Sequence, residues 1–94
     1  MFTCRIPGIY WFYTSLTSDV DGSHNNCYIK LNGSLKGLAF IPDYVGTFET
    51  GAVSEVFRLN HGDRVQVGSC WNATKLFANF PSNSFSGVLV KPDE

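Results

Sequence analysis

Long apolar runs, strong net charge and helical periodicity are all missing from this sequence of 94 residues. No apolar run approaches the roughly 18 residues of a transmembrane helix, so no membrane span is predicted. The formal net charge is −1 and 16% of the residues are charged, which gives no bulk attraction to nucleic acid or to an anionic membrane. The residues after Met1 also lack the basic start, apolar middle and cleavage site of a signal peptide.

Motifs for catalysis and for metal binding are missing as well. No G-x-S-x-G elbow supports a Ser/His/Asp triad around His61 and Asp63, so the protein is not expected to be an enzyme. The cysteines and histidines fit no zinc-ligand spacing, and no metal site is predicted from them: Cys4, Cys27, Cys70, His24 and His61.

An acidic loop resembles the start of a calcium loop without completing one. Asp19 and Asp21 precede Gly22, but the remaining oxygen ligands of an EF-hand are absent. A solvated polar loop is the simpler interpretation, and no cofactor is predicted.

Apolar residues are abundant, at 44%, and aromatic residues make up 15%. This composition can build a core, and the length favours one domain. The stretch GIYWFYTSL, residues 8–16, places aromatic rings on both faces of a strand, because Tyr10 and Phe12 point one way and Trp11 and Tyr13 the other. Both faces are therefore expected to be covered, although parity alone does not say which pair faces the core.

Turn signals divide the rest of the chain into short strands. The clearest is a hairpin over residues 27–41, in which Asn32-Gly33 predicts a two-residue type I′ turn. Other strands are predicted over 2–6, 52–59, 64–68 and 84–90, with loops over 17–26, 43–50 and 70–83. Six or seven short strands separated by turns predict an antiparallel sandwich.

Four short motifs in the same order resemble a known family. They are Phe2-Thr3-Cys4…Pro7-Gly8-Ile9-Tyr10-Trp11-Phe12, Leu31-Asn32-Gly33, Leu59-x-x-Gly62-Asp63-x-Val65 and Phe85-Ser86-Gly87-x-Leu89. From Phe2 to about Lys91, the chain resembles the globular domain of the complement C1q family, which shares a jelly-roll fold with tumour necrosis factor. The resemblance implies an all-β, antiparallel jelly-roll sandwich that occupies residues 1–94 as a single, partial domain. The family's strands that precede the first motif, and its collagen-like or coiled-coil stalk, have no counterpart here.

The resemblance also implies a homotrimer, since domains of this family assemble around a three-fold axis. One face of an aromatic strand would then pack inside the sandwich and part of the other against neighbouring subunits. The candidate core and trimer residues are Tyr10, Trp11, Phe12, Tyr13 and Phe85.

A cysteine pair seen in several complement-type members corresponds to Cys4 and Cys27, so the resemblance implies a disulfide between them. Two buried free thiols are the alternative. Cys70 is left over, and three roles stay open for it: a buried thiol, an intermolecular bridge, or a bridge to a cysteine outside this sequence.

Two glycosylation sequons are present. Turn chemistry accounts for the one at Asn32 in the tight hairpin, whereas Asn72, which precedes Ala73 and Thr74, is the glycosylation candidate. Family members often hold calcium near the trimer apex, but no specific ligand motif transfers to this sequence.

The implied function is that of a secreted, extracellular recognition module, either an innate-immune pattern-recognition protein or a lectin-like one. Its ligands would be proteins, carbohydrates or microbial-surface molecules, bound through exposed loops. The candidate binding residues are Trp71, Asn72, Phe77, Asp19, Asp21 and Asp43. The alternatives are a signalling or matrix-scaffold module that binds a receptor, and a non-functional fragment.

Overall fold

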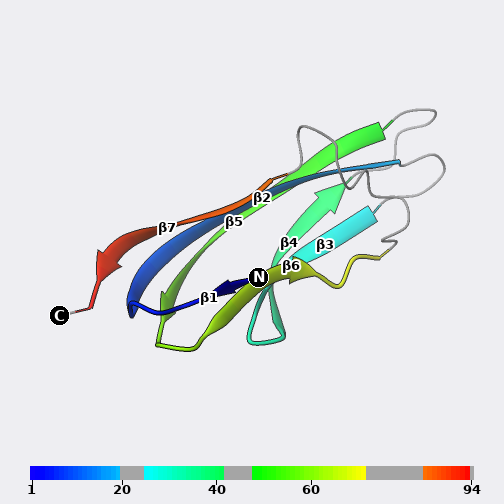
Figure 1. Cartoon of the computed structure of the whole chain (residues 1–94). Helices are drawn as coiled ribbons and strands as arrows, with labels where there is room; N and C mark the ends of the chain where they lie inside the picture. The colour runs from blue at the N-terminus through cyan, green and yellow to red at the C-terminus, as the bar shows by residue number, and fades with distance from the viewer. Residues whose placement is uncertain (20–24, 42–47, 72–83, 94) are drawn as a thin grey trace.

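The computed structural model of the chain describes residues 1–19, 25–41, 48–71 and 84–93. Every regular element in these ranges is a β-strand, and every strand pairing is antiparallel (Figure 1). The strands are β1 (Phe2–Thr3), β2 (Gly8–Asp19), β3 (Asn25–Leu31), β4 (Ser34–Ile41), β5 (Phe48–Leu59), β6 (Arg64–Gly68) and β7 (Ser84–Pro92).

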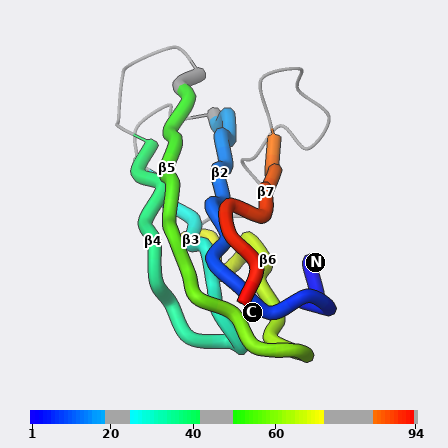
Figure 2. Tube along the Cα trace, turned by 90° about the vertical axis from the view of Figure 1, so that its left-hand side faces the viewer, coloured from blue at the N-terminus to red at the C-terminus, as the bar shows by residue number. Residues whose placement is uncertain are grey.

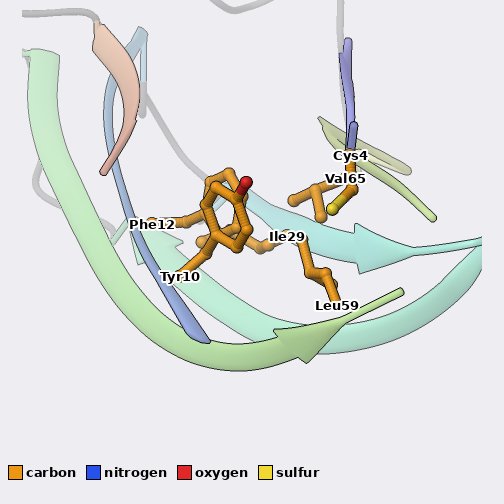
Figure 3. Packing of buried hydrophobic residues seen from close by; sticks show 6 residues of the cluster. All are labelled: Cys4, Tyr10, Phe12, Ile29, Leu59 and Val65. Carbon is orange, nitrogen blue, oxygen red and sulfur yellow. The ribbon is translucent and has the colours of Figure 1, made fainter. Parts of the chain in front are cut away.

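The strands form two sheets. The larger sheet has the order β1-β6-β3-β4, and the smaller has the order β5-β2-β7 (Figure 2). Buried apolar side chains from both sheets meet between them, including Phe12 of β2, Ile29 of β3 and Val65 of β6 (Figure 3). The structure is thus an all-β sandwich of two antiparallel sheets, as the sequence predicts.

The hairpin predicted at Asn32-Gly33 is present. Leu31 pairs with Ser34, which leaves a two-residue turn between β3 and β4. Asn32 has φ 51° and Gly33 has φ 86°. Positive φ at both central residues defines the type I′ turn that Asn-Gly favours, and its twist matches the twist of the flanking strands.

Phe12 lies at the centre of the core. Four aromatic rings have centroids 5.3–6.1 Å from the centroid of its ring, and it stacks on one of them, Phe85, at 5.9 Å. Phe2 meets it edge-on at 5.3 Å. A Cβ on Gly87 would stand 2.6 Å from the same ring, so the absence of a side chain at Gly87 makes room for Phe12.

Several strands are longer than predicted. Residues 17–19 belong to β2, residues 25–26 to β3 and residues 48–50 to β5, although all were expected in loops. The polar side chains of Thr17, Ser18, Asn25 and Thr50 do not end these strands, because they bond to one another in pairs. The hydroxyls of Thr17 and Thr50 lie 2.7 Å apart across β2 and β5, and Asn25 Nδ2 donates to Ser18 Oγ at 2.9 Å.

The first strand is shorter than predicted, since β1 holds Phe2–Thr3 where residues 2–6 were expected. Cys4 leaves the sheet to bond with the turn between β5 and β6. Its backbone N–H donates to the Asp63 carbonyl, and the Gly62 N–H donates to the Cys4 carbonyl, both at 2.8 Å.

Candidate interaction surfaces

The two faces of β2 differ sharply in exposure. Tyr10 and Phe12 are buried between the sheets, whereas Trp11 points outward with 40% of its surface exposed and Tyr13 is half-buried. The structure therefore shows which pair of aromatic residues faces the core, a question that the sequence left open. Tyr10 and Phe12 face the core, and Trp11 and Tyr13 face away from it.

An apolar row crosses the outer face of the smaller sheet at Trp11. Trp11 pairs with Val56 of β5 on one side and with Val88 of β7 on the other. Both valines are exposed, at 60% and 51%. Tyr13 lies beside Trp11 with ring centroids 6.1 Å apart. We call Val56, Trp11 and Val88 the Trp11 row. Contiguous exposed apolar side chains of this kind mark interaction surfaces.

A second apolar patch lies on the outer face of β4 and consists of Leu35, Leu38 and Phe40, each about half exposed. We call these residues the β4 patch. Leu38 and Phe40 alternate with Ala39 and Ile41, which are buried. This patch was not predicted, although the signal was present: apolar residues occupy both parities of 38–41, as they do in 9–13.

The predicted disulfide between Cys4 and Cys27 is wrong. Cys27 is bonded to Cys70, and Cys4 is a buried free thiol. The sheet order explains the difference, because β6 lies between β1 and β3. Two strand spacings are roughly 9–10 Å, which exceeds the Cα separation of about 7 Å that a disulfide spans. Cys70 closely follows β6 and thus lies beside β3.

The disulfide fixes the position of Trp71. The Trp71 backbone N–H donates to the Asn26 carbonyl at 2.8 Å, next to the Cys27–Cys70 bond. The indole is nevertheless 69% exposed. An exposed aromatic ring on a covalently held backbone loses little conformational entropy when a ligand binds, so Trp71 is well suited to recognition.

The other predicted binding residues are placed less fully. Asp19 ends β2 and pairs with Phe48, so it belongs to a strand. Asp21, Asp43, Asn72 and Phe77 lie outside the described residues. Phe85 of β7 stacks on the core residue Phe12, yet 38% of its own surface is exposed.

The strand ends that flank the three predicted loops lie at one end of the sandwich. Asp19 pairs with Phe48, and Asn25 pairs with Ile41. Trp71 is bonded beside Asn26 at the same end. These strand ends and Trp71 define one pole of the described structure, which we call the Trp71 end.

Two groups of the described residues have shifted pKa values. Burial raises the pKa of the Tyr10 hydroxyl, and the neighbouring Cys4 thiol adds to the shift. The Tyr10 hydroxyl donates to the Ile6 carbonyl at 2.7 Å, as a neutral phenol does. The Asn60 backbone N–H and then the Asn32 amide hold the pKa of the Asp63 carboxyl below its ordinary value of 3.8. Both shifts have structural causes, and neither group lies in a cleft that points to a reaction.

Neither a metal-binding cluster nor a membrane-spanning helix is found in the part of the chain that the structure describes. No group of three or more His, Cys, Asp or Glu side chains gathers there in a way that would hold a metal ion. Nor does that part of the chain contain a helix with the length and hydropathy needed to cross a membrane.

Two antiparallel sheets with an aromatic core define an all-β sandwich of the jelly-roll class. Comparison with known protein families then identifies it more closely: the C1q domain model matches residues 1–90. The chain belongs to the C1q domain family. Domains of this family are recognition and structural modules rather than enzymes.

Two similar proteins support this assignment. The mouse collagen alpha-1(X) chain is 30% identical over 94 residues, which cover 98% of this chain and 14% of that protein. This chain therefore spans about one seventh of the curated relative that it matches. Among solved structures, the globular domain of zebrafish complement 1qA protein superposes with a TM-score of 0.66 at 23% identity, covering 98% of this chain and 69% of that one. At this identity, the second similarity shows the fold alone.

Proposed function

We propose that this chain is an extracellular C1q recognition module that acts as a homotrimer and binds its ligand at the Trp71 end. The Trp11 row carries this proposal. An aromatic ring and two valines at matched positions on three neighbouring strands expose apolar surface that folding leaves uncovered. Covering an aromatic side chain of this kind contributes about 2–3 kcal/mol before the costs of association.

The two exposed patches support a ring rather than a two-fold dimer. The Trp11 row lies on the smaller sheet and the β4 patch on the larger, so they are different surfaces. A cyclic ring needs contacts that join one surface of a subunit to a different surface of the next, whereas a two-fold dimer pairs a surface with itself. The Trp11 row of one subunit therefore packs on the β4 patch of its neighbour.

The ligand proposed for the Trp71 end is a protein, carbohydrate or microbial-surface molecule, as for an innate-immune or lectin-like recognition protein. The exposed Trp71 indole supports this assignment, because tryptophan is enriched in the contact surfaces of recognition proteins. Glycosylation of Asn72 and a contribution from Asp21, Asp43 and Phe77 remain proposals. The proposed module requires no cofactor and catalyses no reaction.

Assembly is tested by sedimentation velocity on the full 94-residue chain. Trp11→Lys and Leu38→Lys are each expected to convert a trimer to monomers, because each places a charge in one half of the contact. Ile6→Lys is the control, since Ile6 is also an exposed apolar residue, at 57% against 40% for Trp11 and 45% for Leu38, and belongs to neither patch. A wild-type chain that sediments as a monomer at every concentration would refute the proposed ring.

Ligand binding is tested separately, with a glycan array and a bacterial-binding assay on wild type and Trp71→Ala. Loss of binding in a variant that still forms trimers is expected. Binding that survives this change unaltered would exclude Trp71 from the ligand surface.

The similarity to a collagen chain favours a second candidate, a matrix-scaffold module that binds a receptor. The two candidates differ in what the trimer binds. A cell-binding screen that succeeds where the glycan and bacterial assays fail would select the scaffold role.

A further inference from the structure

Asn32 lies at the tip of the β3–β4 hairpin, and hydrogen bonds to both polar atoms of its side-chain carboxamide hold it there. Its Nδ2 donates to Asp63 Oδ1 at 3.0 Å, and its Oδ1 accepts from the Arg64 backbone N–H at 2.8 Å. Its own backbone N–H donates to the Arg64 carbonyl at 2.8 Å. The side chain thus ties the β3–β4 turn to the β5–β6 turn, although Asn32 itself is exposed to water.

Asp63, the partner of Asn32, is fixed in turn. Its Oδ2 accepts from the Asn60 backbone N–H at 2.8 Å, and its backbone carbonyl accepts from Cys4. One carboxylate therefore binds two turns at once. We call the bonds from Asn32 to Asp63 and Arg64 the Asn32 clamp.

The residue after Asn32 makes the Asn32 side chain prone to a spontaneous chemical reaction. Gly33 has no side chain, and space is open around its Cα, so its backbone nitrogen can reach the Asn32 Cγ once the carboxamide is free to rotate. Attack forms a Gly33 N–Cγ bond and breaks the Cγ–Nδ2 bond. Nδ2 leaves as ammonia with the proton of the Gly33 nitrogen. Water then opens the cyclic imide to aspartate or isoaspartate, and no oxidant or reductant is needed.

We propose that Asn32 is a site of spontaneous deamidation, that the Asn32 clamp holds this reaction back in the folded protein, and that the reaction opens the clamp irreversibly. The clamp opposes the attack because both polar atoms of the carboxamide, Nδ2 and Oδ1, are hydrogen-bonded to groups outside the β3–β4 hairpin. Rotation towards the Gly33 nitrogen breaks both bonds, one of them to a charged acceptor.

The reaction product cannot re-form the clamp. Conversion of Asn32 to aspartate removes the N–H donor and places a carboxylate against the Asp63 carboxylate. Two like charges at hydrogen-bond distance repel each other. Isoaspartate also lengthens the backbone in a turn that has two residues between its paired strands. Either product loses the side-chain bond from position 32 to Asp63 and leaves the two turns joined through the backbone bond to the Arg64 carbonyl. This holds whatever the oligomeric state or ligand of the protein.

The rate of deamidation tests the proposal. The full chain is incubated at neutral pH and 37 °C, and peptide mapping by mass spectrometry follows the gain of about one mass unit at Asn32. Asp63→Ala is expected to accelerate the reaction about tenfold, because one charge-assisted hydrogen bond to the carboxamide is lost. Asn25, which lies at the far end of β3 and bonds to Ser18, serves as the internal reference, and its conversion should not change.

A control variant separates the clamp from general destabilisation. Val67→Ala removes part of a side chain that packs against the core and leaves the Asn32 clamp intact. If Val67→Ala, at a similar loss of melting temperature, accelerates Asn32 conversion as much as Asp63→Ala does, global unfolding controls the rate and the proposal fails. It also fails if Asp63→Ala converts no faster than wild type.

The irreversible opening has its own test. Asn32→Asp reproduces the product, whereas Asn32→Gly removes the clamp without adding a charge and still accepts the positive φ of this position. Asn32→Asp is expected to melt at a lower temperature than Asn32→Gly at neutral pH, and the difference should shrink in acid. Equal melting temperatures at both pH values would overturn the proposed repulsion.

Discussion

The two long sides of the sandwich are closed in different ways. On one side β4 and β5 approach each other through their backbones. A Cβ on Gly51 of β5 would collide with the backbone of Phe40 in β4, and a Cβ on Gly37 of β4 would lie 2.7 Å from Glu55. On the other side β1 has two residues, and the outer edge of β7 pairs with no strand in the described ranges. There the rings of Phe2 and Phe85 meet on Phe12 and cover the opening.

This contrast shows that one sandwich can use two kinds of contact. We call the two sides the β4–β5 side and the β1–β7 side. Glycine lets two backbones approach on the first, so the contact there has little freedom to adjust. Aromatic side chains fill the β1–β7 side, and they can shift or rotate out of their positions. The β4–β5 side should therefore be rigid and intolerant of added volume, and the β1–β7 side should be sensitive to removed volume.

The largest effect is expected from Phe12→Ala. The change removes the ring on which Phe2 and Phe85 meet, and truncation of a buried phenylalanine costs about 3–5 kcal/mol of unfolding free energy. For a domain of this size, which is marginally stable, such a loss should unfold much of the population. Urea titration followed by circular dichroism measures it. A loss below about 1 kcal/mol would mean that the β1–β7 side does not depend on Phe12.

A slightly smaller effect is expected from Cys70→Ser, which removes the Cys27–Cys70 bond. A native disulfide typically contributes about 2–4 kcal/mol. This bond joins β3 to the residues after β6 and lies on neither side of the sandwich. Hydrogen exchange should therefore show faster opening throughout the larger sheet, with the contrast between the two sides preserved. Cys4→Ser is the control, because Cys4 forms no disulfide.

A matched pair of glycine substitutions compares the two sides directly. Gly51→Ala places a methyl group against the Phe40 backbone, whereas Gly87→Ala places one against the Phe12 ring. We expect Gly51→Ala to cost about 1–3 kcal/mol and Gly87→Ala to cost less, because a ring can rotate away and a paired backbone cannot. Melting temperatures of the two variants test the ranking. The reverse order would contradict the distinction between the two sides.

The smallest effect is expected from acid. The pKa of Asp63 is lowered in the folded state, so its contribution to stability is present above its unfolded value of 3.8 and is lost as the pH falls through the folded value. Asp63→Asn should melt at a lower temperature than wild type at pH 6 and at the same temperature near pH 2, because the carboxylate bonds are lost from wild type in acid. Arg64 and His61 are the charged or titratable neighbours along this turn, so His61→Gln serves as the control. Because Cys4 bonds to Asp63, acid should loosen the β1–β7 side first.

Particular residues show what could be predicted from the sequence. Asn32-Gly33 specified its turn because few other dipeptides accept positive φ twice. The alternation of Val65 and Gln66 specified β6 and its inward face in the same way. Short-range backbone chemistry and side-chain parity set both features, so the sequence alone was enough to predict them.

Other features depended on contacts between distant segments. Thr17 and Ser18 have the polar character of loop residues, and their partners lie on other strands: Thr50 is 33 residues from Thr17, and Asn25 is 7 residues from Ser18. The pairing of Cys27 with Cys70 required the strand order, which spacing does not contain. The faces of Trp11 and Phe12 could be separated only once the second sheet was placed, because both residues are aromatic.

Both tryptophans of the chain lie at the surface, Trp11 on the outer face of β2 and Trp71 beside the disulfide. Intrinsic fluorescence of an isolated subunit will therefore change little on unfolding, because both indoles already contact water in the folded monomer. The same emission should shift strongly to the blue when a subunit covers Trp11 or a ligand covers Trp71. Single-tryptophan variants would then distinguish assembly from recognition optically in one titration.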